Sequence, residues 1–109
     1  MSDASVHMQD FRHVPVARGY LSRIRGLIGS HALFLYIPRC AAVHTCFMRS
    51  AIDLVFLDEG GVILALRHFA RPWRIFVGPR GTCSVLELPP GHAATCGLGV
   101  GDRIAVNQP

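Results

Sequence analysis

The chain has 109 residues, of which 50% are hydrophobic and 17% are charged. This length and composition predict one compact domain and exclude a chain that is disordered throughout. The formal net charge is +4, and every one of the 11 basic residues is arginine. No apolar run approaches the roughly 20 residues that span a bilayer, so we expect no membrane span. Residues 1–13 lack the apolar segment of a secretory signal, which predicts a cytoplasmic protein.

The N-terminal part of the chain begins with a polar stretch and continues with apolar residues at regular spacing. Residues 1–10 are polar and predict a disordered tail, which leaves 11–109 as a single β-rich domain. Residues 11–17 are typical of a short edge strand, because Pro15 has no N–H for a central ladder. Apolar residues in 19–28 recur at helical spacing while the arginines fall elsewhere on the wheel, which predicts a short amphipathic helix.

The remaining chain consists of short apolar runs separated by glycine and proline. These runs predict strands at 32–38, 42–48, 51–58, 62–69, 73–78, 83–89 and 102–106. The Asp-Glu-Gly-Gly sequence at 58–61 lies between two runs and predicts a hairpin. A second short helix is expected over 91–96, with Gly97 as its C-terminal cap. The pattern predicts a mainly β fold, a small antiparallel β-sandwich or barrel with one or two short helices.

A metal site is one interpretation of residues 40–48. On a straight strand Cys40, His44, Cys46 and Met48 would share one face, and their donor atoms suit a soft metal ion. Residues two apart on a strand, however, lie roughly 6.5–7 Å apart, which is too far for ligands bonded at roughly 2.0–2.3 Å to one ion. We therefore expect no metal and no cofactor. None of the four cysteines stands in a C-x-x-C motif, so we expect reduced, unpaired thiols.

An enzyme is a second interpretation, with His44 as the acid or base and Asp53 or Glu87 orienting it. The sequence offers little else for catalysis. Cys46 lies among apolar residues, which disfavour a reactive thiolate. The glycine-rich stretch at 97–101 matches neither a phosphate-binding loop nor a dinucleotide fingerprint.

Asp53 and Glu87 each lie inside an apolar strand, where a charge would be buried. An unpaired buried carboxylate costs several kcal/mol, so each acid must have partners. For Asp53 we expect an ion pair with Arg25 or Arg49, and backbone N–H groups are the other option. Such acids either support the fold or form the floor of a ligand cleft, and the sequence leaves both open.

An anion or nucleic-acid binder is a third interpretation. The arginines are spread along the chain, whereas a nucleic-acid footprint should be clustered, so we do not expect nucleic acid as the main partner. Four of them nevertheless come close together and could match phosphate oxygens: Arg67, Arg71, Arg74 and Arg80.

Four motifs in the chain resemble a small prokaryotic family known as domain of unknown function 192. They are R-x-R-G-L at 23–27, H-T-x-x-M-R-x-x-I-D at 44–53, L-E-L-P-x-G at 86–91 and G-D at 101–102. The resemblance covers about residues 17–106, nearly the whole chain. One departure is Ala51, where the family often has proline, and it makes the turn before Ile52 less rigid.

The resemblance implies a compact, mainly β fold and no established reaction, because the family is uncharacterised. Some relatives are exported and some lie beside pilus-assembly genes, which implies an accessory role by association only. Our leading interpretation is a non-enzymatic binding or accessory domain, acting as a single chain on an unknown small ligand or protein partner. No catalytic residue is assigned. The candidate ligand-binding residues are His44, Thr45, Arg49, Asp53, Arg25 and Glu87.

Overall fold

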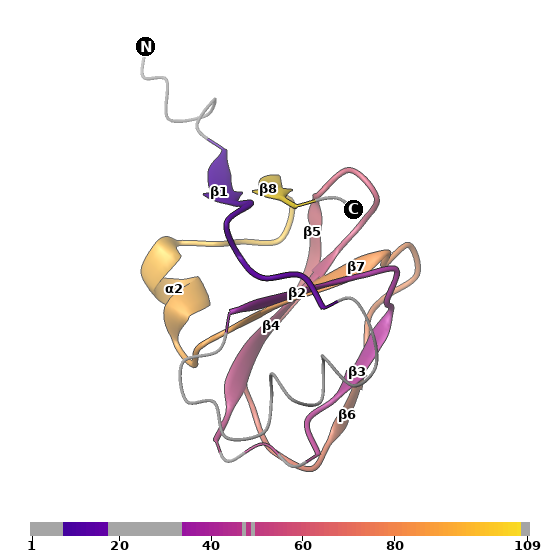
Figure 1. Ribbon diagram of the computed structural model, residues 1–109, viewed down its shortest axis with the longest axis vertical. Helices are drawn as coiled ribbons and strands as arrows, with labels where there is room; N and C mark the ends of the chain where they lie inside the picture. Colours follow the sequence, from indigo (N-terminus) through magenta and orange to yellow (C-terminus); the bar gives the residue numbers. More distant parts are fainter. Residues whose placement is uncertain (1–7, 18–33, 47, 49, 108–109) are drawn as a thin grey trace.

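The computed structural model describes residues 8–17, 34–46, 48 and 50–107 (Figure 1). In this part of the chain, strands dominate and the one helix is short, so the predicted mainly β fold is confirmed. The helix expected at 19–28 lies outside the described residues. The elements are β1 Gln9–Phe11, β2 Leu35–Pro38, β3 Ala42–His44, β4 Ile52–Leu57, β5 Ile63–Ala70, β6 Ile75–Val77, β7 Ser84–Leu88, α2 His92–Cys96 and β8 Ile104–Val106.

A four-stranded antiparallel sheet, in the order β2-β7-β4-β5, forms the centre of the domain. Two small sheets flank it, an antiparallel ribbon of β3 and β6 and a parallel pair of β1 and β8. Every residue of β4 and β7 is buried. Neither face of the sheet is open to water at these strands. Their sequences are therefore nearly continuous apolar runs and do not alternate between apolar and polar residues.

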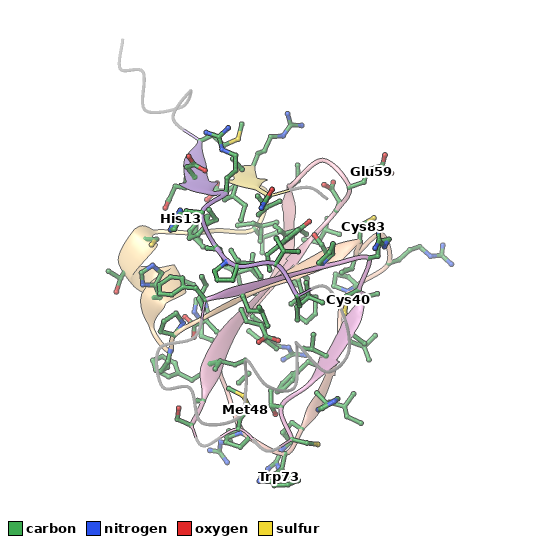
Figure 2. All side chains as sticks on the ribbon, viewed as in Figure 1. His13, Cys40, Met48, Glu59, Trp73 and Cys83 are labelled. Carbon is green, nitrogen blue, oxygen red and sulfur yellow. The ribbon has the colours of Figure 1, made fainter. Side chains whose placement is uncertain are left out.

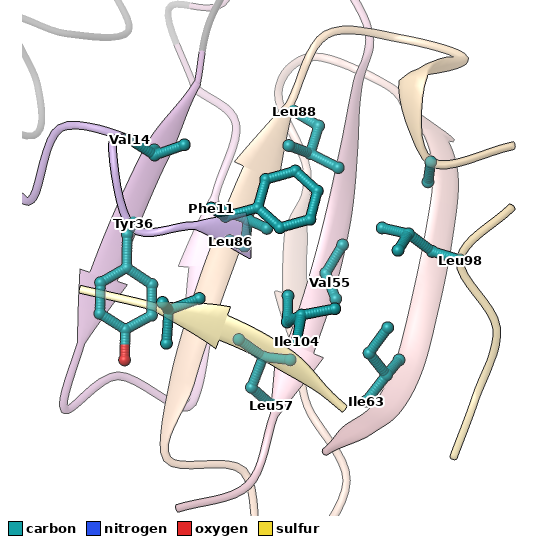
Figure 3. Packing of buried hydrophobic residues seen from close by; sticks show 12 residues of the cluster. Phe11, Val14, Tyr36, Val55, Leu57, Ile63, Leu86, Leu88, Leu98 and Ile104 are labelled. Atoms are coloured by element: carbon teal, nitrogen blue, oxygen red, sulfur yellow. The ribbon is translucent and has the colours of Figure 1, made fainter. Parts of the chain in front are cut away.

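The two faces of the central sheet hold two separate cores. On the first, which we call the α2 face, Val55 and Leu86 pack with Phe11 of β1, Ala93 of α2 and Ile104 of β8 (Figure 3). On the opposite face, which we call the ribbon face, the side chains pack towards the β3–β6 ribbon. The buried residues of the ribbon face are Ala17, Leu35, Ile37, Val43, Met48, Ile52, Leu54, Phe56, Ala70 and Val85.

The predicted hairpin at 58–61 is present between β4 and β5. The Asp58 carboxylate accepts hydrogen bonds from the N–H groups of Gly60 at 2.8 Å and Val62 at 2.9 Å. Gly61 has φ 85°, a left-handed value that glycine adopts without steric cost. Its N–H donates to the Asp58 carbonyl at 3.1 Å. The conformation of the turn is therefore determined by residues within it and beside it.

The predicted short helix and its cap are confirmed. Helix α2 spans His92–Cys96 and ends at Gly97, whose φ is 72°. The N–H of Gly97 donates to the Ala94 carbonyl, and the N–H of Leu98 donates to the Ala93 carbonyl, each at 3.0 Å. These bonds satisfy carbonyls that the end of the helix would leave without partners. Among the described residues no helix is long and apolar enough to cross a membrane.

The N-terminal boundary differs from the sequence-based expectation. Strand β1 begins at Gln9, inside the tail predicted for 1–10, and pairs with β8. The edge strand expected at 11–17 is interrupted, because the chain turns after Phe11 and only Val16 pairs further on, as an isolated bridge to Tyr36. The turn is stabilised by the N–H of Arg12, which donates to the Asp10 carboxylate at 2.9 Å.

Candidate functional site

The structure separates the two buried acids that the sequence singled out. Asp53 and Glu87 are both fully buried, and they lie on the neighbouring strands β4 and β7. Asp53 is paired with Leu88, whose side chain belongs to the α2 face, whereas Glu87 is paired with Leu54 of the ribbon face. Cross-strand partners point to the same side of a sheet. The two carboxylates therefore point to opposite faces and do not line one cleft.

Asp53 connects three elements through one carboxylate. Its Oδ1 accepts a hydrogen bond from the N–H of Phe69 in β5 at 2.9 Å, and its Oδ2 accepts one from the N–H of Ala93 in α2 at 3.0 Å. Backbone N–H groups, the option placed second in the sequence analysis, are thus its partners among the described residues. Arg25 and Arg49 lie outside those residues. Each charge-assisted bond is stronger than a neutral one, so this acid holds β4, β5 and α2 together.

A β-bulge in β5 explains why the N–H of Phe69 is available to Asp53. Ile52 pairs with Ala70 and Leu54 pairs with Arg67, so Asp53 alone faces two residues of β5. Phe69 has φ 55° and its side chain is 58% exposed. A left-handed conformation of a bulky residue costs about 1–3 kcal/mol and is retained where surrounding contacts impose it. Bulges often occur next to binding sites because they redirect a side chain.

Thr45 fixes the backbone of the loop that follows β5. Its side chain is 1% exposed, and its Oγ donates to the Arg71 carbonyl at 2.6 Å and accepts from the N–H of Arg74 at 3.0 Å. Its own N–H donates to the Arg74 carbonyl at 2.8 Å, and its carbonyl accepts from the N–H of Trp73 at 2.9 Å. The loop at 71–74 is therefore bonded to the end of β3 through side chain and backbone together.

A cavity of about 230 Å³ lies at this end of β5, between the bulge and the loop. We call it the bulge pocket. Its lining residues are Arg67, His68, Phe69, Ala70, Arg71, Arg74 and Phe76. The lining residues include three arginines and no acidic residue. The guanidinium carbon of Arg67 lies 5.8 Å from the centre of the Phe76 ring, a cation–π distance.

The bulge pocket brings together three of the four arginines that were expected to form an anion site, because Arg80 does not line it. His68, Phe69 and Phe76 were not among the predicted site residues, because 62–69 and 73–78 were each predicted to be a regular strand. A usable signal was present in the alternation of arginine with aromatic residues between 67 and 76.

His44 lies apart from Asp53. It occupies the end of β3 opposite Ile75 of β6, on the side away from Val43, which is buried in the ribbon face. Its Nδ1 is buried and has no hydrogen-bond partner among the described residues. Asp53 points to the α2 face, on the other side of the central sheet. The acid–base pair of His44 with Asp53 therefore lacks the hydrogen bond that it requires.

The stretch 40–48 does not form the straight strand on which the metal interpretation depended. Strand β3 ends at His44, and Cys46 lies in a turn. In the part of the chain that the structure describes, no three His, Cys, Asp or Glu side chains are placed to bind one metal ion. The four cysteines are free thiols, and Figure 2 shows Cys40 and Cys83 in the same region. The N–H of Cys40 donates to the Cys83 carbonyl at 3.0 Å.

The motifs and the fold agree with a family model. The model of DUF192, whose description is uncharacterized ACR, matches residues 3–106. The chain belongs to this family. The DUF192 chain is 32% identical over 99 residues to a protein of Thermococcus sibiricus named UPF0127 protein, covering 84% of this chain and 64% of the relative. A UPF0127 protein of Pyrococcus abyssi is 31% identical over 98 residues, covering 84% and 83%.

Another relative, from Pyrococcus furiosus, is 37% identical over 68 residues, covering 62% of this chain and 58% of the relative. The DUF192 chain thus spans less than two thirds of the T. sibiricus and P. furiosus proteins.

Two crystal structures share the fold of the DUF192 chain. One is a protein from Sinorhizobium meliloti proposed to be a transcription regulator, with a TM-score of 0.68 and 21% identity over 81% of this chain and 74% of that one. The other is a protein of unknown function from Novosphingobium aromaticivorans, with a TM-score of 0.69 and 21% identity over 81% and 70%. At this identity the likeness shows the fold alone.

Proposed function

We propose that this DUF192 domain is a binding domain whose ligand carries an anionic group, held in the bulge pocket by Arg67, Arg71 and Arg74. The observation that carries the proposal is the lining of the pocket, which has three arginine residues and no acidic residue. Guanidinium forks match the oxygen atoms of phosphate and carboxylate groups. A concave surface with charges of one sign also raises the local concentration of the opposite ion.

The backbone of the pocket is fixed by contacts that do not involve the ligand. Asp53 bonds the N–H of Phe69 on one side, and Thr45 bonds the backbone of Arg71 and Arg74 on the other. A site with a fixed backbone loses less conformational entropy when it binds, so more of its interaction energy appears as affinity. Asp53 and Thr45 thus support the backbone of the pocket and do not contact the ligand.

The lining favours recognition over catalysis. Apart from the arginines and His68, its side chains are those of Phe69, Ala70 and Phe76. It therefore contains no hydroxyl, thiol or carboxylate that could serve as a nucleophile or as a carboxylate base. This composition supports the non-enzymatic binding domain that the sequence analysis placed first.

Calorimetric titration with inorganic tripolyphosphate at low salt tests the proposal. Replacing the three pocket arginines by glutamine removes three charge-assisted contacts, and we expect the Kd to rise at least about tenfold, since each such contact contributes about 1.5–3 kcal/mol.

The matched control replaces three exposed arginines outside the pocket, Arg39, Arg80 and Arg103, by glutamine. It changes the net charge by the same amount and should raise the Kd less than about threefold, as expected for screened, distant charges. Equal losses in both triple variants would show a diffuse charge effect and would rule out the pocket as the site.

A further inference from the structure

We propose that the anionic group is a phosphate of a single-stranded nucleic acid, whose bases stack on the exposed rings of Phe69 and Trp73. The inference rests on the proposed function and names its ligand. It depends on three features, namely the size of the bulge pocket, the exposure of the two rings and the order of charges and rings along the chain.

The bulge pocket is smaller than the sites that usually enclose drug-sized organic ligands. Its volume is about 230 Å³, whereas pockets for complete small molecules usually measure about 300–1,000 Å³. A phosphate, or a phosphate with part of its sugar, fits such a volume. A ligand larger than this therefore extends outside the pocket, across the neighbouring surface.

Two aromatic rings are exposed in the segment that forms the pocket, since Phe69 lines it and Trp73 lies in the loop between the lining residues Arg71 and Arg74. Phe69 and Trp73 are each 58% exposed, although most large apolar side chains of the described chain are buried. Both have left-handed backbone conformations, with φ 55° and 60°, and the only other such non-glycine residue among those described is Arg39. Strained backbone that holds a side chain in solvent is a feature of ligand clamps. Figure 2 shows Trp73 at the end of the molecule opposite β1.

Charges and rings alternate along the segment that forms the pocket. Phosphates and bases alternate in the same way along a nucleic-acid strand. Single-strand binding proteins combine basic grooves for the backbone with aromatic rings on which bases stack, whereas duplex bases are already stacked on each other. The alternating residues are Arg67, Phe69, Arg71, Trp73, Arg74 and Phe76.

An anionic membrane would also attract this surface, but the position of Phe69 favours stacking. A Cβ placed on Gly91 would lie 3.5 Å from Cζ of Phe69, so the ring rests on the loop before α2 and does not project freely into solvent. A ring that is supported on one side and open on the other offers a platform for a base. The exposed aliphatic side chains Ile75 and Val77 lie further along, on β6.

The test measures the binding of a short fluorescein-labelled oligothymidylate by anisotropy, beside tripolyphosphate binding by calorimetry. The double variant Phe69→Leu, Trp73→Leu removes both rings and keeps apolar side chains. We expect it to weaken oligothymidylate binding at least about tenfold, because ring removal costs that much per stacked base. Tripolyphosphate binding should change less than about twofold in the single variant Trp73→Leu, because Trp73 is not among the lining residues of the pocket, and the exposed control Val77→Ala should leave both affinities unchanged.

A second measurement needs no variant. Trp73 is the single tryptophan of the chain, so its fluorescence reports on stacking in the wild-type protein. We expect oligothymidylate to quench it and tripolyphosphate to leave it unchanged. Tight oligothymidylate binding without quenching would overturn the role of Trp73, even if the double variant failed to fold.

The outcomes separate this inference from the proposed function. If tripolyphosphate binds and oligothymidylate does not, or if oligothymidylate binding survives loss of both rings, the inference is wrong and the proposed function stands. If neither ligand binds, the proposed function fails and the inference fails with it. Binding to phosphatidylserine-containing vesicles that oligothymidylate does not displace would overturn the inference in favour of a membrane surface.

Discussion

The two ends of β4 carry aspartates that use the same chemistry over different distances. At the first end, Asp53 is 0% exposed and accepts hydrogen bonds from Phe69 and Ala93, which lie 16 and 40 residues away in sequence. At the second end, the half-buried Asp58 accepts from Gly60 and Val62, only 2 and 4 residues away. The local acid forms a turn, whereas the long-range acid positions a pocket.

The cavities at the two ends differ in charge. The cavity at the Asp58 end has a volume of about 170 Å³, and its lining includes Arg39 together with Asp58 and Glu59. Positive and negative groups there compensate each other. The bulge pocket at the Asp53 end has arginines without acids. Under the proposed function the Asp53 end is the one that selects an anion, and Asp53 itself does not line the pocket.

The largest expected effect comes from neutralising the buried acid. Asp53→Asn keeps one acceptor but turns an NH₂ group towards a backbone N–H, so one buried donor loses its bond. We expect the free energy of unfolding to fall by about 3–5 kcal/mol. The matched change Asp58→Asn, in a turn that water reaches, should cost about 1 kcal/mol. Urea denaturation gives both values, and equal losses would contradict the distinction between the two ends.

A steric change at the Asp58 end should have the next largest effect. A Cβ on Gly61 would lie 2.6 Å from the Ile104 carbonyl oxygen, and its φ is 85°. Gly61→Ala should therefore lower the free energy of unfolding by about 2–4 kcal/mol. The loss comes from the left-handed conformation and from displacement of the hydrogen bond that the N–H of Ile104 in β8 donates to the Gly61 carbonyl at 2.9 Å.

Gly81 is the control for this change, since it has φ 96° but its nearest neighbour would be the Leu64 side chain at 3.6 Å. Gly81→Ala should cost only the conformational part, about 1–2 kcal/mol. Thermal unfolding of the two variants measures the difference, and identical midpoints would show that the contact with Ile104 relaxes freely.

Removing the Thr45 hydroxyl should weaken both the fold and the pocket. Thr45→Val keeps the shape of the side chain but leaves the Arg71 carbonyl and the Arg74 N–H without this partner, at a cost of about 2 kcal/mol. Tripolyphosphate affinity should fall about tenfold as the loop loosens. Thr82→Val, which removes a bond from Thr82 Oγ to the Pro79 carbonyl of 2.7 Å outside the pocket, should leave that affinity unchanged.

The smallest effect concerns an exposed carboxylate. Hydrogen bonds from Arg12 lower the pKa of Asp10 from 3.8 to about 2. A lowered pKa stabilises the folded state above pH 3.8, and that contribution is lost as the pH falls through about 2. NMR titration of Arg12→Gln should return the pKa of Asp10 towards its ordinary value, with little change in unfolding because the pair lies in solvent. An unchanged pKa would exclude Arg12 as the cause.

Local features of this chain could be predicted from sequence, and features that depend on strand register could not. The hairpin at 58–61 and the cap at Gly97 are determined by residues beside them, and both predictions are confirmed. The opposite orientations of Asp53 and Glu87 depend on how β4 pairs with β7, which no local pattern reveals. The bulge at Phe69 is equally hidden, since its N–H finds its acceptor on another strand.

The candidate site also has features that could be predicted from local sequence and features that could not. The charge cluster of Arg67, Arg71 and Arg74 was visible in the sequence because these residues are close along the chain. The role of Thr45 was not, because it acts on a loop 26 to 29 residues away. Two of the polar residues predicted as ligand contacts, Asp53 and Thr45, form hydrogen bonds with the backbone of the segment that carries the arginines.

The shared carboxylate of Asp53 has a consequence for the motions of the domain. The N–H groups of Phe69 and Ala93 depend on two oxygens of one side chain, so a rotation that releases one amide disturbs the other. Local opening of the bulge and fraying of α2 should therefore be a single event, with matched hydrogen-exchange rates at the two amides. An anion that stabilises the bulge pocket would then slow hydrogen exchange in α2, although it does not contact the helix. Occupancy of the pocket and stability of the helix would be coupled through Asp53.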